Sequence, residues 1–318
     1  MAAQDITQRF LFENADVRGE LVSADQSYRE ILAKHPYPQP VQALLGEMLA
    51  AAVLLSTTIK FDGLLILQAR SSGPLSTLMV ECSSKQGVRG IARYADDLSG
   101  ETLGELMPDG VLAITIDPDK GQRYQGIVSL EGGSLAESLG SYFANSEQLP
   151  TRFRLHADGR VARGFLLQAL PADRQKDEQE RADTWAHLNV LADTITAEEL
   201  IGLDNETLLH RLYHQEEVRL FDAQPVHFEC SCSMERSGNA LVSLGQDDVL
   251  ALLEEQGGEI TVDCQFCNSR YRFDEPAVQA LFLFFGIMAR LRAESALSQW
   301  TKTNLNPHGL RPNRSVFR

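Results

Sequence analysis

Four of the five cysteines in this chain form two tight pairs, a Cys-x-Cys at Cys230 and Cys232 and a Cys-x-x-Cys at Cys264 and Cys267. Thirty-one residues separate the two pairs. Four thiolates on two short turns are the ligand set of a closed tetrahedral zinc site. Neighbouring thiols can also be oxidised to disulfides, Cys230 with Cys232 and Cys264 with Cys267. The spacing therefore predicts a structural metal site, a redox switch, or both.

The other candidate ligands fit such a site less well. Four cysteines leave no open coordination position, so a catalytic zinc is not expected. His227 lies three residues before Cys230, where it is an alternative ligand, but it is more simply an exposed strand residue. Cys82 falls in an apolar run and is expected to be a buried core thiol. The predicted cofactor is one Zn²⁺ per chain, held by Cys230, Cys232, Cys264 and Cys267.

The cysteines lie in a small module, predicted over residues 226–275. About 50 residues bury too little apolar surface to fold securely alone. Zinc would supply the missing stability, on the order of 10–16 kcal/mol. Oxidation of the thiolates would remove the ligands, and the module should then unfold. The expected small core of the module consists of Phe228, Phe266, Tyr271 and Phe273.

Residues 1–172 are predicted to form an α+β domain with a mixed sheet and helix core. One long helix, Val41–Thr58, is apolar around most of its circumference and should be buried. Period-2 patterns and turn residues predict the strands. The predicted strands are Val17–Ala24, Leu64–Ala69, Leu75–Cys82, Gly90–Tyr94, Val111–Ile116, Tyr124–Leu130, Arg152–Ala157 and Gly164–Leu170, and the other helices are Asp25–Lys34 and Ser134–Asn145, the latter with a capping box of Ser134 and Glu137.

A charged helical linker is predicted over residues 173–225. The segment from Ala172 to Arg219 has 12 acidic and 5 basic residues, a net charge of −7. Thr196 and Glu199 form a capping box. The apolar residues that follow make one thin helical stripe of Leu208, Leu209, Leu212 and Tyr213. Helices of this kind are marginally stable by themselves, because most helical stability comes from packing.

Composition limits the possible partners and compartments. The chain has 318 residues and a net charge of −15, which argues against nucleic acid as the main partner. The first residues lack a signal-peptide pattern, and the longest apolar runs are too short to span a bilayer. We therefore expect a cytoplasmic protein that does not bind membranes. A basic tail is predicted over 276–318; its Leu281–Met288 run suits an interfacial helix, but we expect the tail to be dispensable for zinc binding.

Beyond the cysteines, several motifs make the chain resemble the 33 kDa chaperonin family (heat-shock protein 33). The resemblance covers residues 8 to 280, and the combination of motifs is highly specific. The tail departs from it, because the family pattern ends in a short polar segment. The motifs are Phe10-Leu-Phe-Glu-Asn14, Val17-Arg-Gly-Glu-Leu21, Tyr37-Pro-Gln-Pro40, Lys60-Phe-Asp-Gly63, Arg123-Tyr-Gln-Gly-Ile-Val-Ser-Leu-Glu-Gly132, Ser146-Glu-Gln-Leu-Pro-Thr151 and Arg211-Leu-Tyr-His-Gln-Glu-Glu217.

The resemblance implies a redox-regulated, ATP-independent holdase chaperone rather than an enzyme. The reduced, zinc-bound form would be inactive. Oxidation would form two disulfides among Cys230, Cys232, Cys264 and Cys267, release zinc and unfold the module and the linker. The active form would be a homodimer that holds unfolded client proteins and later passes them to ATP-dependent chaperones. Clients would bind either the released linker or the apolar surface of the core domain.

Two other functions compete with this one. A zinc ribbon that binds nucleic acid or a partner protein would carry basic and aromatic residues around its cysteines, whereas this module is rich in Asp and Glu. A thiol-disulfide oxidoreductase using Cys264 and Cys267 would need that pair at the start of a helix in a thioredoxin-like context. The pair instead follows a strand-like run and precedes Tyr271-Arg-Phe273.

Overall fold

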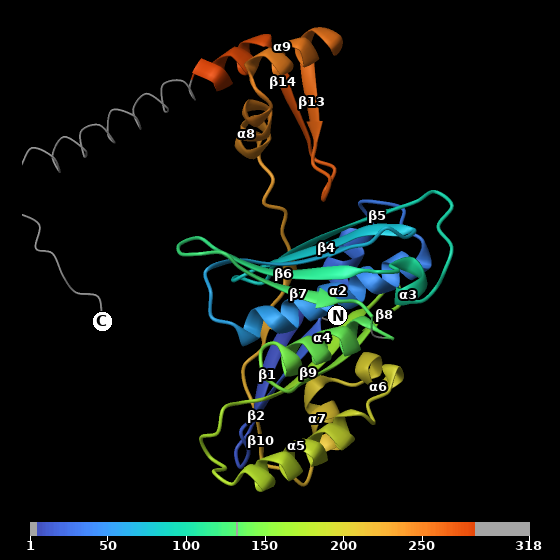
Figure 1. Cartoon of the computed structure of the whole chain (residues 1–318), viewed down its shortest axis with the longest axis vertical. Coiled ribbons are helices and arrows are strands. Elements are labelled where there is room, and N and C mark those ends of the chain that lie inside the picture. The colour runs from blue at the N-terminus through green and yellow to red at the C-terminus, as the bar shows by residue number, and fades with distance from the viewer. Residues whose placement is uncertain (1–4, 132, 284–318) are drawn as a thin grey trace, which may run out of the picture. The chain divides into compact units, whose positions relative to one another are not determined.

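The computed structural model describes residues 5–131 and 133–283, and the chain divides into two compact units. The first unit consists of residues 1–230 with 265–267, and the second consists of 231–264 with 268–318. The first unit contains two large sheets with helices packed on them, as the blue to yellow ribbon of Figure 1 shows. This architecture confirms the predicted α+β class.

The first sheet has the strand order β10-β1-β2-β9-β8, with β11 also paired to β1. All of its pairings are antiparallel. The prediction missed β1, because the polar residues Gln8 and Arg9 interrupt its apolar pattern. Its strands are β1 (Ile6–Phe12), β2 (Val17–Ser23), β8 (Thr151–Ala157), β9 (Ala162–Ala169), β10 (Val218–Leu220) and β11 (Gln224–Pro225).

The second sheet has the order β12-β5-β4-β3-β6-β7. It is antiparallel except at its end, where β12 pairs with β5 in parallel. Each predicted strand of this sheet is present within three residues of its predicted bounds. The strands are β3 (Gly63–Arg70), β4 (Leu75–Ser83), β5 (Gly87–Tyr94), β6 (Val111–Pro118), β7 (Tyr124–Ser129) and β12 (His227–Phe228).

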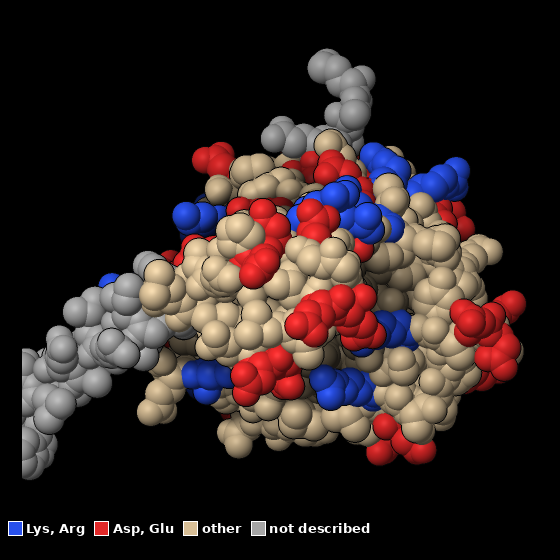
Figure 2. Space-filling model, turned by 90° about the horizontal axis from the view of Figure 1, so that it is seen from above, with Lys and Arg blue, Asp and Glu red and all other residues tan. Residues whose placement is uncertain are grey.

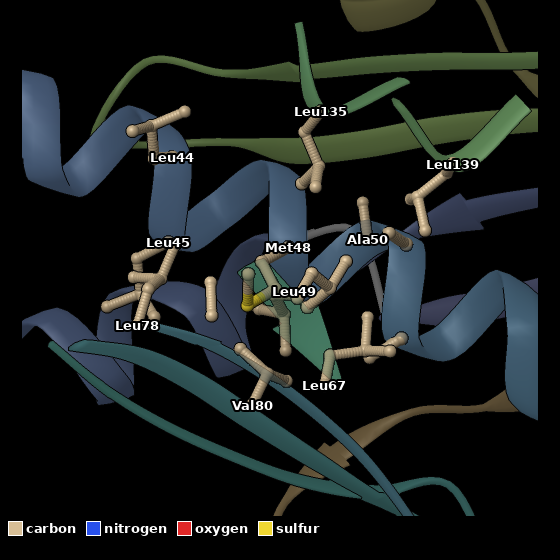
Figure 3. Packing of buried hydrophobic residues seen from close by; sticks show 14 of the residues in the cluster. Leu44, Leu45, Met48, Leu49, Ala50, Leu67, Leu78, Val80, Leu135 and Leu139 are labelled. Atoms are coloured by element: carbon tan, nitrogen blue, oxygen red, sulfur yellow. The ribbon is translucent and has the colours of Figure 1, made fainter. Parts of the chain in front are cut away.

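Helix α2 (Gln39–Thr58) lies between the two sheets and packs on both. In Figure 3, Leu67, Leu78 and Val80 of the second sheet point toward this helix. The helix is long and apolar enough to cross a membrane, because its most apolar 18-residue stretch has a mean hydropathy of 1.5. However, 72% of that stretch is buried inside the structure, as in the core helix of a soluble protein. Its burial confirms the predicted core helix. The first apolar cluster is the core centred on α2, which α1 (Asp25–Leu32), α3 (Leu103–Leu106) and α4 (Leu135–Asn145) help to enclose.

Three further helices cover the opposite face of the first sheet. They are α5 (Glu178–Ala192), α6 (Ala197–Gly202) and α7 (Asn205–Tyr213). The predicted capping box at Thr196 and Glu199 is present, and the predicted stripe from Leu208 to Tyr213 is buried. The stripe packs on strand residues and so forms a second apolar cluster, separate from the first. Its members are Phe10, Phe12, Ala15, Val17, Leu21, Phe165 and Leu167 of the sheet layer and Leu188, Ala192, Leu200, Leu208, Leu209, Leu212 and Tyr213 of the helices.

The second unit contains a hairpin, whose first strand is the predicted strand-like run before Cys264, and helices that were not predicted. They are α8 (Met234–Leu244), α9 (Gln246–Glu255), β13 (Glu259–Asp263) and β14 (Arg270–Asp274). The predicted aromatic core is only partly correct. Phe273 is buried in the unit and Tyr271 packs beside it, but Phe228 packs against the first cluster. The actual core is aliphatic, because Leu241, Val249, Leu253, Ile260 and Val278 surround Phe273.

The tail is described only in part. Leu281 and Phe282 pack against the core of the second unit, and Leu283 is exposed. The remainder of the Leu281–Met288 run, and everything to residue 318, lies outside the described residues.

Candidate metal centre

The Cys264–Cys267 pair lies on the turn of the hairpin formed by β13 and β14. The Cys264 amide donates to the Ser269 carbonyl at 2.9 Å, and the Asn268 amide donates to the Cys264 carbonyl at 2.8 Å. Asn268 adopts a left-handed backbone conformation with φ 61°, which asparagine tolerates better than most residues. These bonds hold the two cysteines on one tight turn.

The Cys230–Cys232 pair lies between strand β12 and helix α8. The Glu229 amide donates to the Val88 carbonyl at 2.9 Å, so the chain is fixed to β5 up to the residue before Cys230. Ser233 follows Cys232 and caps α8 by accepting from the Arg236 amide. The Cys-x-Cys segment is therefore held by a strand on one side and a capped helix on the other.

The four sulfur atoms converge. The Sγ atoms of Cys230, Cys232, Cys264 and Cys267 all lie within 4.8 Å of one another, and the four residues are half-buried. A zinc ion with Zn–S bonds of about 2.3 Å requires sulfur atoms roughly 3.8 Å apart in a tetrahedron. The structure thus brings together four cysteines close enough to bind a metal ion, and thiolates are ligands that suit zinc.

Two side chains outside the cysteine motifs donate hydrogen bonds to this cluster. The Tyr271 hydroxyl donates to Cys232 Sγ at 3.1 Å, and Arg89 Nη1 donates to Cys230 Sγ at 3.5 Å. Arg89 also pairs with Glu81 at 2.7 Å and lies 4.1 Å from the centre of the Phe266 ring. A guanidinium beside the Cys230 thiolate offsets part of its negative charge. No sequence pattern predicts this role of Arg89, because Arg89 lies 141 residues before Cys230 in the chain.

The remaining candidates lie apart from the cluster. His227 is in β12 with a 52% exposed side chain, as the strand interpretation predicted, and its Nε2 lies 3.8 Å from a Glu229 carboxylate oxygen. Cys82 is fully buried on β4, and this burial raises the pKa of its thiol to about 12. Since the thiolate is the reactive form, Cys82 is inert at neutral pH.

Comparison with known proteins gives one consistent result. The family model described as "Hsp33 protein" matches residues 5–274. Proteins named 33 kDa chaperonin from Pseudomonas paraeruginosa and Azotobacter vinelandii are each 66% identical over 284 residues, covering 89% of this chain and 96% of the relative. The one from Pseudomonas fluorescens (strain Pf0-1) is 62% identical over 285 residues.

The fold also matches a solved structure. The crystal structure of the 33 kDa chaperonin from Thermotoga maritima superposes with a TM-score of 0.74 at 24% identity, covering 88% of this chain and 98% of that one. At that identity the superposition establishes the fold, while the sequence matches establish the family. This chain belongs to the Hsp33 family of chaperones.

Proposed function

We propose that this chaperone is a redox-regulated, ATP-independent holdase that is inactive when reduced and zinc-bound. Its parts would be a core domain of residues 1–172, a linker of 173–225, a four-cysteine switch of 226–275 and a divergent tail of 276–318. Zn²⁺ at Cys230, Cys232, Cys264 and Cys267 would hold the two cysteine turns together, contributing on the order of 10–16 kcal/mol.

The observation that carries the proposal is the second apolar cluster. Buried strand residues such as Phe10 and Phe165 are covered by Leu208, Leu212 and Tyr213 of the linker. A contiguous apolar sheet face binds the apolar side chains of unfolded proteins once it is exposed to solvent. The linker helices are held by this packing and by their caps, so they depend on staying docked. Their release would expose two complementary apolar surfaces, one on the sheet and one on the linker.

The switch itself is an oxidation of four thiolates. Each pair gives up two electrons as one S–S bond forms, so two molecules of hypochlorous acid convert four thiolates into two disulfides, two chloride ions and two hydroxide ions. We assign the disulfides to Cys230 with Cys232 and to Cys264 with Cys267, because each pair lies on its own turn. Sulfur atoms joined in disulfides are no longer thiolate ligands, so the two turns lose their common attachment.

The linker is coupled to the switch by chain continuity. Residues 214–229 join helix α7 to Cys230 without interruption. When the cysteine module unfolds, this segment loses its fixed end, and the marginal linker follows. Its net charge of −7 between Ala172 and Arg219 would keep a complex with a client soluble.

The active form would bind unfolded or misfolded proteins in the bacterial cytoplasm during oxidative stress. We propose that it is a homodimer and that its clients pass to ATP-dependent chaperones after the thiols are reduced again. Prevention of aggregation by binding needs no catalysed bond change, so we propose that the protein is not an enzyme.

The two competing functions receive less support. Cys264 and Cys267 lie on a hairpin turn rather than at a helix start, unlike the pair of a thioredoxin-like oxidoreductase. On the face that Figure 2 shows, Lys and Arg side chains lie among Asp and Glu side chains. That face therefore offers no continuous basic surface for a nucleic-acid backbone.

The test combines zinc release with holdase activity. Reduced protein is treated with hypochlorous acid while a colorimetric chelator reports free zinc, and the same samples are mixed with a thermally unfolding client. Release of one zinc per chain together with new suppression of aggregation supports the proposal. Zinc that stays bound, or zinc release without suppression of aggregation, contradicts it. Catalytic turnover in insulin reduction by dithiothreitol would favour the oxidoreductase instead.

A further inference from the structure

One extended segment forms the end strand of both sheets. Residues 217–229, which we call the strap, lie between α7 and Cys230. The strap pairs antiparallel with β1 through β10 and β11, and then parallel with β5 through β12. The strap thereby covers the β1 edge of the first sheet and the β5 edge of the second. In Figure 1, β10 follows β1 along the edge of the first sheet.

Backbone hydrogen bonds hold the strap in place. The Phe221 amide donates to the Arg9 carbonyl at 2.9 Å, and the Glu13 amide donates to the Glu217 carbonyl at 2.9 Å. Farther along, the His227 amide donates to the Gln86 carbonyl at 3.1 Å. Because these bonds involve the main chain alone, the edges they satisfy can accept any extended polypeptide.

At its two ends the strap alternates inward and exposed side chains, as a half-buried strand does. Val218 and Leu220 pack against the second apolar cluster, and Arg219 between them is exposed. Val226 is 5% exposed in the first cluster, and Phe228 packs against that cluster. An occupant of these edges thus places apolar side chains inward at the positions of β10 and β12, while the middle of the strap, residues 221–225, is exposed.

The other edges of the two sheets do not depend on the strap. The first sheet ends at β8, where Arg152 and Arg154 both pair with Asp193, and the second ends at β7. The arginine side chains on β8 and their ion pairs with Asp193 resist the addition of another strand at that edge, whereas β7 (Tyr124–Ser129) has no charged residue. Within residues 5–131 and 133–283, the β1 and β5 edges are the ones covered by a segment connected to the cysteine switch.

We propose that the edges vacated by the strap form a client-binding site, which takes up an extended segment of unfolded polypeptide as an added strand. The segment has alternating apolar and polar side chains, like the two ends of the strap it replaces. This inference rests on the proposed function, because the strap leaves only when the switch and the linker unfold. Binding at β1 places the client beside Phe10 and Phe12, where the linker has withdrawn from the sheet.

The test uses a labelled peptide with the sequence of residues 215–224 and the full-length protein, reduced or oxidised. Phe221 donates to Arg9, whereas its neighbour Leu220 is in a non-hydrogen-bonded pair with Phe10, so its amide points away from β1. Two variants of the peptide carry one N-methyl group each, on Phe221 or on Leu220. They have the same composition and differ only in which amide is blocked.

Fluorescence anisotropy should show binding to oxidised protein alone. The Leu220-methylated peptide should bind within about threefold of the unmodified one, and the Phe221-methylated peptide about tenfold more weakly, as expected for a lost edge hydrogen bond. Equal binding of the two variants, or no binding of any peptide, overturns the inference. Binding that requires dissociation of an oxidised dimer also overturns it, because the edges would then belong to a second copy of the chain.

Failure of the inference can be distinguished from failure of the proposed function. If oxidised protein suppresses aggregation but does not discriminate between the peptides, clients bind the apolar faces without adding a strand. If oxidation gives no suppression of aggregation, the holdase proposal itself is wrong.

Discussion

The two apolar clusters of the first unit differ in how their halves are joined. In the first cluster, α2 packs against both sheets, and its residues from Met48 to Leu55 are all at most 1% exposed. In the second cluster, one half belongs to the first sheet and the other half to helices α5, α6 and α7, the proposed linker. The first cluster cannot open without unfolding both sheets, whereas the second opens when three short helices undock.

Because of this difference, we expect the first cluster to determine the stability of the unit and the second cluster to be the part that opens during regulation. Local regions with few partners open at lower free energy than the global unfolding of a domain. The second cluster is also continuous in sequence with the cysteine module, through the strap. In the proposed mechanism, a small module that depends on a metal would therefore control the exposure of a surface that it need not touch.

The largest effect is expected from replacing two of the cysteines. The double variant Cys264→Ser, Cys267→Ser should lose tight zinc binding, and with it stabilisation on the order of 10 kcal/mol. The module should unfold, and the protein should be partly active without oxidant. Zinc content and client aggregation measure both effects. Cys82→Ala is the control, since Cys82 lies apart from the cluster and its loss should leave zinc content unchanged. A double variant that remains folded and inactive would contradict the mechanism.

Replacing one buried leucine by alanine in each cluster compares the roles of the two clusters directly. Leu212→Ala, at a site 3% exposed, should destabilise linker docking by about 2–5 kcal/mol and give holdase activity while zinc remains bound. Leu49→Ala, at a fully buried site on α2, should lower the global midpoint of unfolding without creating that activity. Val190→Ala, on a 65% exposed residue of α5, is the neutral control. If Leu49→Ala activates as strongly as Leu212→Ala, the clusters do not have separate roles.

The start of the linker is anchored by a carboxylate. Asp16 accepts hydrogen bonds from the amides of Asp173, Arg174 and Gln175 at 3.0–3.1 Å. Burial raises the pKa of Asp16, but these amides and the Arg174 charge lower it more, so its pKa lies below the ordinary value of 3.8. The anchor therefore stabilises the folded form above about pH 4 and is lost as the pH falls through the depressed pKa.

Asp16→Asn should weaken linker docking by about 1–3 kcal/mol at neutral pH. Hydrogen exchange of α5 measures the effect. The difference from the parent protein should shrink as acid protonates the parent's carboxyl, whereas acid-induced loss of zinc affects both proteins alike. Asp173→Asn is the matched control, because it keeps the backbone amide. A difference that persists unchanged at low pH would assign the effect to something other than the charge.

The smallest effect concerns one hydroxyl. The Tyr213 hydroxyl donates to the Leu188 carbonyl at 3.2 Å and so links α7 to α5. Tyr213→Phe keeps the ring but should cost about 0.5–1.5 kcal/mol, shifting activation to lower oxidant concentrations. Tyr124→Phe, on an exposed tyrosine outside the linker, should leave the oxidant titration unchanged. An unshifted titration for Tyr213→Phe would mean that this bond does not limit linker release.

Sequence patterns predicted the elements whose signals are local. The long apolar helix, the strands of the second sheet and the box at Thr196 and Glu199 all follow from periodicity or capping chemistry. The convergence of the four cysteines was predicted from their spacing. The role of Arg89 and the pairing of the strap with β1 depend on contacts far apart in the chain, for which one sequence holds no signal. Helices α8 and α9 are hard to predict because each is short and buries only two residues, so its apolar pattern is weak.

Hydrogen–deuterium exchange before and after oxidation tests the central claim most directly. We expect the amides of α5, α6, α7 and the strap to lose protection when zinc is released, while those of α2 and of β3, β4 and β6 keep it. Loss of protection in both clusters together would mean global unfolding. Retained protection in the linker of an oxidised protein with full holdase activity would contradict the claim that uncovering the second cluster creates the activity.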